Sequence, residues 1–112
     1  MIPLSIREKI PYNDEKNGIR YFIQPITGEN EDVFLDIMAK FQHGMTNKEQ
    51  LPILNELFNF LITGWEPITK DTKVMTFPSD GNPARFFNYK AKDHLTDVAI
   101  AQSGLGAPEV KN

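Results

Sequence analysis

Hydrophobic and other side chains alternate with a period of two near the start of the chain, as in a β-strand. Ile19, Tyr21 and Ile23 occupy every second position of residues 19–26, a segment rich in β-forming residues. A second apolar segment covers residues 4–11, and the stretch between the two ends in Asn17-Gly18, a pair that favours a tight hairpin turn. Each segment holds a proline, which cannot donate to a strand ladder, so the strands are expected to be short or at a sheet edge. The pattern predicts an N-terminal β-hairpin over residues 4–26.

The hydrophobic period then changes to the three-to-four spacing of a helix. Over residues 30–43 the apolar side chains form one stripe, which consists of Val33, Phe34, Ile37, Met38 and Phe41. Thr27 or Asn30 can cap the start of this helix, and Gly44 suits a left-handed end. The spacing predicts an amphipathic first helix.

A second predicted helix covers residues 47–63 and is apolar around most of its circumference. Thr46 and Glu49 have the spacing of a capping box at its start. Pro52 either begins the regular helix or interrupts it, because proline lacks the N–H that an interior position donates. A helix this apolar lies at the centre of the core or is covered by a partner. It is expected to end at Gly64-Trp65.

The remaining sequence is expected to be a linker over residues 64–81, a third helix over 83–103 and a flexible tail over 104–112. Within the linker, Val74 to Phe77 suits a short strand or an extended tether. Pro83 suits the first helical position, and a break is expected near residues 88–92. Phe86, Phe87, Ala91, Leu95, Val98, Ala99 and Gln102 are the expected buried side of this helix. The fold class is α+β and mostly helical, with the hairpin packed on two antiparallel helices and a C-terminal helix in a single domain of residues 1–103.

Composition and charge exclude several classes of function. The 112 residues include no cysteine and carry a formal net charge of −3, so disulfides, thiolate metal sites and a basic nucleic-acid surface are not expected. No apolar run approaches the ~20 residues of a membrane span, and the N-terminus lacks the features of a signal peptide. The expected location is the cytoplasm of the cell that makes the protein, with no membrane and no nucleic acid as partner.

Few residues carry chemistry that would indicate an enzyme. The two histidines, His43 and His94, are far apart in the sequence and have no metal-ligand spacing. Asp93 and Asp97 share a helix face, but lysines beside them indicate a solvated surface. The sequence therefore predicts a protein that is not an enzyme and has no cofactor or metal. A small hydrolase or nuclease that uses a histidine with these aspartates is the enzymatic alternative.

Aromatic residues are concentrated in the second half of the chain and supply the candidate binding residues. Trp65 follows the predicted second helix, so its ring either packs on the core or projects outward as an anchor for a partner protein. The candidate protein-binding residues are Trp65, Phe58, Leu61, Phe34 and Phe41. If the second helix is fully buried, the surface is expected around Phe34, Phe41 and the C-terminal helix.

Three short segments together resemble the tail assembly chaperones of long-tailed bacteriophages. An apolar helix runs into Gly64-Trp65-Glu66, a polar connection leads to Phe77-Pro78-Ser79, and the last helix is rich in small apolar residues from Leu95 to Ala101. Two positions depart from the family pattern. Pro67 stands where glycine is usual, and the connection from Lys70 to Met75 lacks the usual Asp-Gly.

The resemblance implies a binder of the tape-measure protein that keeps this long helical protein soluble during tail assembly and is absent from the mature virion. It implies the host cell cytoplasm as the location. A tail-tube subunit is a second partner that the resemblance allows, and self-association into a homo-oligomer stays open. The alternative function is a structural virion protein, such as a head–tail connector or a tail-terminator subunit.

Overall fold

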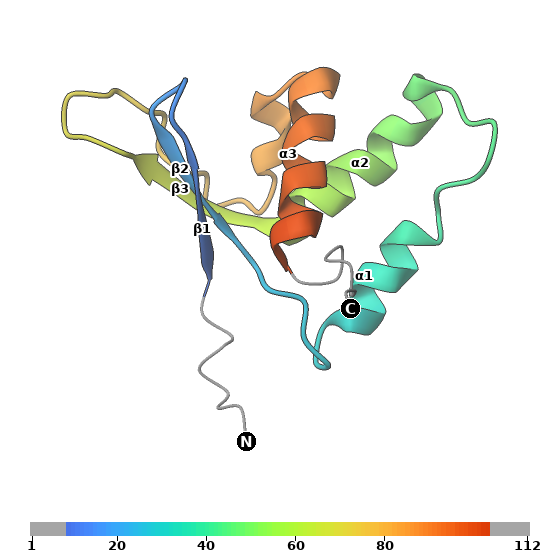
Figure 1. Cartoon of the computed structure of the whole chain (residues 1–112). Helices are drawn as coiled ribbons and strands as arrows, with labels where there is room; N and C mark the ends of the chain where they lie inside the picture. The colour runs from blue at the N-terminus through green and yellow to red at the C-terminus, as the bar shows by residue number, and fades with distance from the viewer. Residues whose placement is uncertain (1–8, 104–112) are drawn as a thin grey trace.

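A computed structural model describes residues 9–103, which form a three-stranded antiparallel sheet and three α-helices (Figure 1). The α+β class is therefore confirmed. The predicted tail over 104–112 and the first part of the predicted strand, residues 4–8, lie outside the described residues.

The hairpin pairs β1 (Ile10–Asp14) with β2 (Ile19–Ile23). Its turn is closed by a hydrogen bond of 2.8 Å from the Gly18 amide to the Asp14 carbonyl, and Gly18 has φ of +71°. Within the described residues, β1 overlaps the predicted strand 4–11 at Ile10 and Pro11 and continues to Asp14, so the predicted end at residue 11 is too early. Pro11 is tolerated because β1 is an edge strand in the order β1-β2-β3.

The main departure from the sequence prediction is a third strand, β3 (Ile62–Pro67), where a helix end and a linker were expected. The helix before it ends at Leu61, and the next residue, Ile62, already has extended backbone angles. β3 pairs antiparallel with β2, with Trp65 opposite Tyr21. The β-branched pair Ile62-Thr63 favours this change, and the unpaired side of β2 supplies the hydrogen-bonding partner. Gly64-Trp65 thus lies within a strand.

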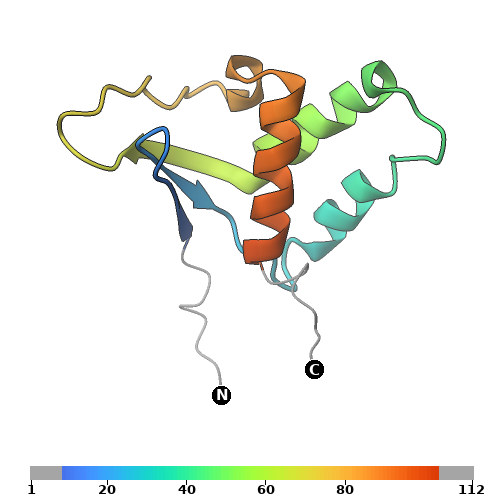
Figure 2. The ribbon, with the colours of Figure 1, turned by 45° about the horizontal axis from the view of Figure 1, so that its top comes forward.

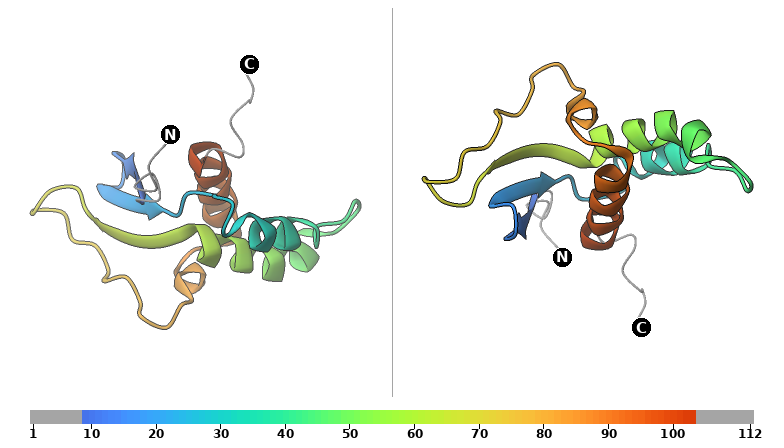
Figure 3. Two further views of the ribbon diagram at one scale, coloured as in Figure 1. Left: turned by 90° about the horizontal axis from the view of Figure 1, so that it is seen from below. Right: turned by 90° about the horizontal axis from the view of Figure 1, so that it is seen from above.

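The first two helices are α1 (Glu31–Met38) and α2 (Asn47–Leu61), which lie side by side and run in opposite directions (Figures 1 and 3). α1 is shorter than predicted, and Gly44, with φ of +87°, lies in the following loop. The capping box of α2 is confirmed, because the Glu49 amide donates to Thr46 Oγ1 and the Thr46 amide to Glu49 Oε1. Pro52 lies inside α2, which begins at Asn47.

The predicted third helix is divided in two, with the break at residues 87–88, at the start of the expected range 88–92, while residues 89–92 are helical. A 3₁₀ turn, η2 (Pro83–Phe86), precedes α3 (Tyr89–Ser103), and Pro83 stands at the first position of the turn. Figure 2 shows α3 crossing α2, while the segment between β3 and η2 arcs away from the sheet and returns. None of the helices within residues 9–103 is long and apolar enough to cross a membrane.

The buried side of α3 differs from the expected one. Leu95 and Ala99 are buried as expected, but Phe86 and Gln102 are exposed. The other buried positions of α3 are polar or charged, namely Lys92, Thr96 and Ser103. Thr96 and Ser103 bond to carbonyl oxygens of their own helix, which satisfies their hydroxyls and lets this small-residue face approach the core closely.

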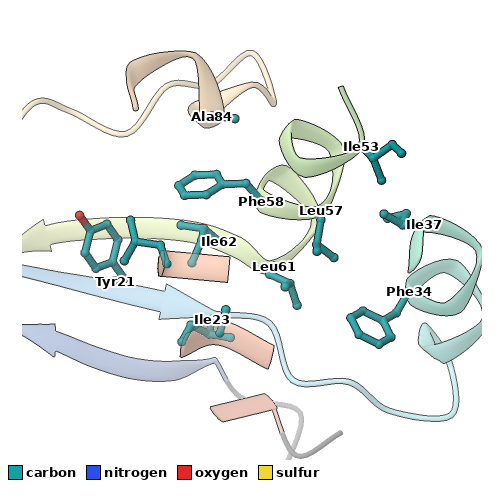
Figure 4. Close-up of a cluster of buried hydrophobic side chains, with 12 residues drawn as sticks. Tyr21, Ile23, Phe34, Ile37, Ile53, Leu57, Phe58, Leu61, Ile62 and Ala84 are labelled. Atoms are coloured by element: carbon teal, nitrogen blue, oxygen red, sulfur yellow. The ribbon is translucent and has the colours of Figure 1, made fainter. Parts of the chain in front are cut away.

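The hydrophobic core lies where α2, the sheet and α3 meet (Figure 4). Phe58 and Leu61 near the end of α2 have no exposed surface, and Ile23 and Ile62 of the sheet are almost completely buried. Burying each large apolar side chain contributes about 1.5–3 kcal/mol. α2 therefore lies at the centre of the core of this chain. Its sequence had indicated either this position or burial by a partner.

Candidate protein-binding surface

The five candidate binding residues fall into two groups. Phe58, Leu61 and Phe34 are buried within the chain, so their side chains are not accessible to a partner in this structure. Trp65 and Phe41 are partly buried and pack against the edge of the core. Of the five candidates, only Trp65 and Phe41 have side-chain surface that a partner could contact. The other three candidates suggested a binding face by their apolar character, but their side chains form part of the core.

Trp65 is the centre of an aromatic cluster. Its ring centroid lies 4.7 Å from that of Phe77, 5.5 Å from that of Phe87 and 6.2 Å from that of Tyr21, each in an edge-to-face arrangement. Its indole Nε1 donates a hydrogen bond of 2.6 Å to the carbonyl oxygen of Met75. Trp65 therefore satisfies its polar atom and most of its ring surface within the chain, as the core interpretation of this residue predicts.

The segment 68–82 is joined to the sheet at its start and middle and to η2 near its end. The Ile68 amide donates a hydrogen bond of 2.9 Å to the Gly18 carbonyl at the hairpin turn, and Trp65 binds Met75 near the middle. At the far end, the Arg85 guanidinium forms an ion pair with Asp80. Val74 to Phe77 belongs to no strand, so the strand interpretation of this stretch is wrong.

Four large apolar side chains remain exposed in residues 9–103, namely Val33, Leu35, Met75 and Phe86. Phe86 is covered on one face by the Arg85 guanidinium, whose carbon lies 4.3 Å from the ring centroid. Val33 and Leu35 are 46% and 52% exposed and lie on the same short helix, α1. The exposure of Val33 corrects the sequence prediction, which placed it in one buried stripe with Phe34 and Ile37, whereas Leu35 was outside that stripe.

The outer side of α1 combines these apolar residues with acidic ones. Asp32 and Asp36 are exposed between Val33 and Leu35 around the helix, opposite the side that buries Phe34 and Ile37. A salt bridge of 2.8 Å from Lys40 to Glu56 joins the end of α1 to α2. Because Phe34 packs against Phe60 at a centroid distance of 6.4 Å, side chains of the chain itself occupy the space between these helices. The side of α1 that faces α2 is therefore not open to a partner protein.

The residues of the enzymatic alternative lie on different elements. His43 is in the loop between α1 and α2, whereas His94, Asp93 and Asp97 are on α3. Burial and then the charge of Asp93 raise the pKa of Asp97, while His94 opposes this change. No group of three metal-ligating side chains occurs within the described range 9–103.

Lys92 is a buried charged residue, whereas Lys90 and Lys92 beside Asp93 and Asp97 were expected to mark a solvated surface; of the two lysines only Lys90 is exposed. It is 5% exposed, and its Nζ donates a hydrogen bond to Asn55 Oδ1 of α2. Burial lowers the pKa of its ammonium group. The long stem fills space between α3 and α2 where an apolar residue would ordinarily be expected, so this residue joins the two helices.

The chain was also compared with known proteins. No protein-family model matches it, and searches of curated proteins and of solved structures find no significant similarity.

Proposed function

We propose that this chain is a protein-binding module that acts as a chaperone of phage tail assembly and keeps the tape-measure protein soluble. The proposal rests on the resemblance of Gly64-Trp65-Glu66, Phe77-Pro78-Ser79 and the segment from Leu95 to Ala101 to that family. It includes a location in the host cytoplasm and absence from the mature virion. Neither a catalytic role nor a cofactor is part of it.

The structural observation that supports protein binding is the outer side of α1. Val33 and Leu35 expose about half of their surface on the two flanks of a helix whose buried side is anchored in the core by Phe34 and Ile37. Exposed apolar residues on a well-anchored helix suit contact with an amphipathic helix of a partner. The tape-measure protein implied by the resemblance is largely helical, and several copies of a weak binder along it would act with avidity.

The proposal is tested by co-expression of this chain with the tape-measure protein of the same phage. The tape-measure protein is expected to stay in the supernatant and to co-purify with this chain, and to precipitate without it. A double variant, Val33→Ser with Leu35→Ser, is expected to lose this effect while remaining folded. Equal solubility of the tape-measure protein with and without the wild-type chain would exclude the proposed function.

The structural alternative is distinguished by mass spectrometry of purified virions. A chaperone is expected to be missing from the particles, whereas a connector or terminator subunit would be present in stoichiometric amounts.

A further inference from the structure

A cleft of about 410 Å³ lies between the end of the β-hairpin and α3. Asp14 and Asn17 of the turn and Ile19 and Tyr21 of β2 form one wall, and the other wall consists of Phe87, Ala91, His94 and Leu95. The volume is within the range of pockets that hold a ligand or a long side chain. Among residues 9–103, the lining includes one carboxylate, that of Asp14, one histidine, His94, and neither Lys nor Arg.

Tyr21 supplies a polar group to this cleft. The residue is only 2% exposed, and its hydroxyl has no hydrogen-bond partner among residues 9–103. Figure 4 shows this hydroxyl at the far end of the core cluster, pointing away from Phe58 and Ile62. No side-chain nitrogen or oxygen of residues 9–103 is buried without a hydrogen-bond partner, so the Tyr21 hydroxyl is open to solvent at the cleft, and a ligand donor can bond to it there.

The charge of the cleft is negative. The Asp14 carboxylate accepts hydrogen bonds from the Asn17 amide and from Asn17 Nδ2, which fix its position at the turn but leave further acceptor capacity. Burial, followed by the charge of Asp14, raises the pKa of Tyr21 to about 12. The hydroxyl is therefore neutral at physiological pH, and its oxygen can accept a hydrogen bond from a ligand.

The remaining walls suit the stem of a long side chain. Ile19, Ala91 and Leu95 are apolar, and the Phe87 ring lies at a centroid distance of 6.3 Å from Tyr21. A guanidinium group has five donors in a planar fork, so it can bond to a carboxylate and a hydroxyl together and stack on an aromatic ring. The net charge of −3 also favours association with a basic segment.

We propose that this cleft receives an arginine side chain of a partner protein, with its guanidinium between Asp14 and the Tyr21 hydroxyl and its stem against Leu95. The cleft recognises the guanidinium group by its positive charge and by its planar set of hydrogen-bond donors. This inference rests on the proposed function in one respect only: it assumes that the chain binds a protein.

A peptide titration tests the cleft directly. The full chain, labelled with ¹⁵N, is titrated with acetyl-Gly-Arg-Gly-amide and with the matching citrulline peptide, which has nearly the same shape but no charge. The arginine peptide is expected to shift amide signals of the hairpin turn and of residues 87–95, and to bind at least about tenfold more tightly than the citrulline peptide. Equal affinities, or shifts outside these segments only, would overturn the proposal.

Two variants separate the cleft from a general charge effect. Asp14→Asn keeps an oxygen for the Asn17 amide but removes the charge, and is expected to weaken arginine binding about tenfold. Tyr21→Phe removes a hydroxyl that has no partner in residues 9–103, so it is expected to weaken binding severalfold while the melting temperature stays near the wild-type value. Asp71→Asn, at an exposed carboxylate outside the cleft, is the matched control. If Asp71→Asn weakens binding as much as Asp14→Asn, the proposal is wrong.

The outcomes also separate this inference from the proposed function. Peptide binding at the cleft with no effect on tape-measure solubility would contradict the chaperone role alone. Solubilisation of the tape-measure protein without selectivity for arginine would contradict the arginine cleft alone.

Discussion

The indole nitrogen of Trp65 in β3 donates a hydrogen bond of 2.6 Å to the carbonyl oxygen of Met75, ten residues later. This bond joins the sheet to the segment 68–82, which has no regular secondary structure of its own. The Phe77 ring packs against the same indole, so one side chain positions the segment by a polar and an apolar contact. Trp65 is therefore a structural residue first, and any contact it makes with a partner uses its remaining exposed surface.

Replacing Trp65 should show this structural role. Trp65→Ala removes the ring contacts with Tyr21, Phe77 and Phe87 and is expected to lower the free energy of unfolding by about 3 kcal/mol. Trp65→Phe keeps most aromatic contacts but loses the bond to Met75, at an expected cost of about 1–2 kcal/mol. Urea denaturation measures both. An unchanged melting temperature in Trp65→Ala would show instead that Trp65 is available as a binding anchor.

The outer side of α1 is expected to be dispensable for folding. Val33→Ser with Leu35→Ser changes two exposed side chains, so the free energy of unfolding should change by no more than about 1 kcal/mol in total. Affinity for the tape-measure protein is expected to fall at least about tenfold, as for loss of a central interface contact. Met75→Ser, at another exposed apolar position, is the control in the pull-down. Equal loss of binding in Met75→Ser would place the surface elsewhere.

Three glycines allow the backbone and packing effects of an added methyl group to be separated. At Gly18, with φ of +71°, a Cβ atom would lie 2.8 Å from Thr72 Cγ2. Gly44 has φ of +87° with open space around it, and Gly28 has neither constraint. Substitution by alanine is expected to cost about 2 kcal/mol or more at Gly18, about 1 at Gly44 and roughly nothing at Gly28. Thermal unfolding of the three variants gives this order, and a cost at Gly28 equal to that at Gly18 would contradict it.

Pro52 is expected to limit the stability of α2. It lies in the interior of the helix at an exposed position, where it cannot donate to the carbonyl oxygen four residues earlier. Pro52→Ala restores the donor and should raise the free energy of unfolding by about 1 kcal/mol or more. A decrease measured by chemical denaturation would show that proline is needed at this position.

Stability should fall at alkaline pH through Tyr21. Its pKa is raised from 10.0 to about 12, first by burial and then by the charge of Asp14. The unfolded chain therefore loses this proton before the folded chain does, and the free energy of unfolding decreases as pH rises from 10 to 12. Tyr21→Phe removes this contribution, so its stability should decline less steeply over the same interval. Identical slopes for the two proteins would mean that Tyr21 titrates alike in both states.

The sequence predicts most of this fold where the signal is local. The turn at Asn17-Gly18 and the capping box of Thr46 and Glu49 depend on residues at most a few positions apart, and both occur as expected. The break between η2 and α3 also follows from local sequence. β3 could not be predicted in this way, because Ile62 to Trp65 continues the apolar pattern of α2 and becomes a strand only by pairing with β2. The apolar pattern of these residues is compatible with a helix and with a strand, and pairing with β2 selects the strand.

The candidate binding residues show the same division. The sequence has more apolar side chains from Leu51 to Leu61 than one face of a helix can hold. Which neighbouring elements cover them depends on the packed fold and not on the local pattern. The structure buries Phe58 and Leu61 against the sheet and leaves Val33 and Leu35 exposed. The unpaired Tyr21 hydroxyl likewise emerges only when the hairpin and α3 are placed together.

By itself the sequence determined an α+β chain with an N-terminal hairpin, a capped and very apolar central helix, and a divided C-terminal helix. These properties follow from residue periodicity, turn chemistry and caps, which act over a few residues. The tertiary structure decided that the segment from Gly64 to Glu66 is a strand, that Trp65 holds the segment 68–82, and that a cleft with an acidic residue and a free hydroxyl lies beside α3. Those features depend on contacts between residues distant in the sequence, and such contacts leave no local pattern.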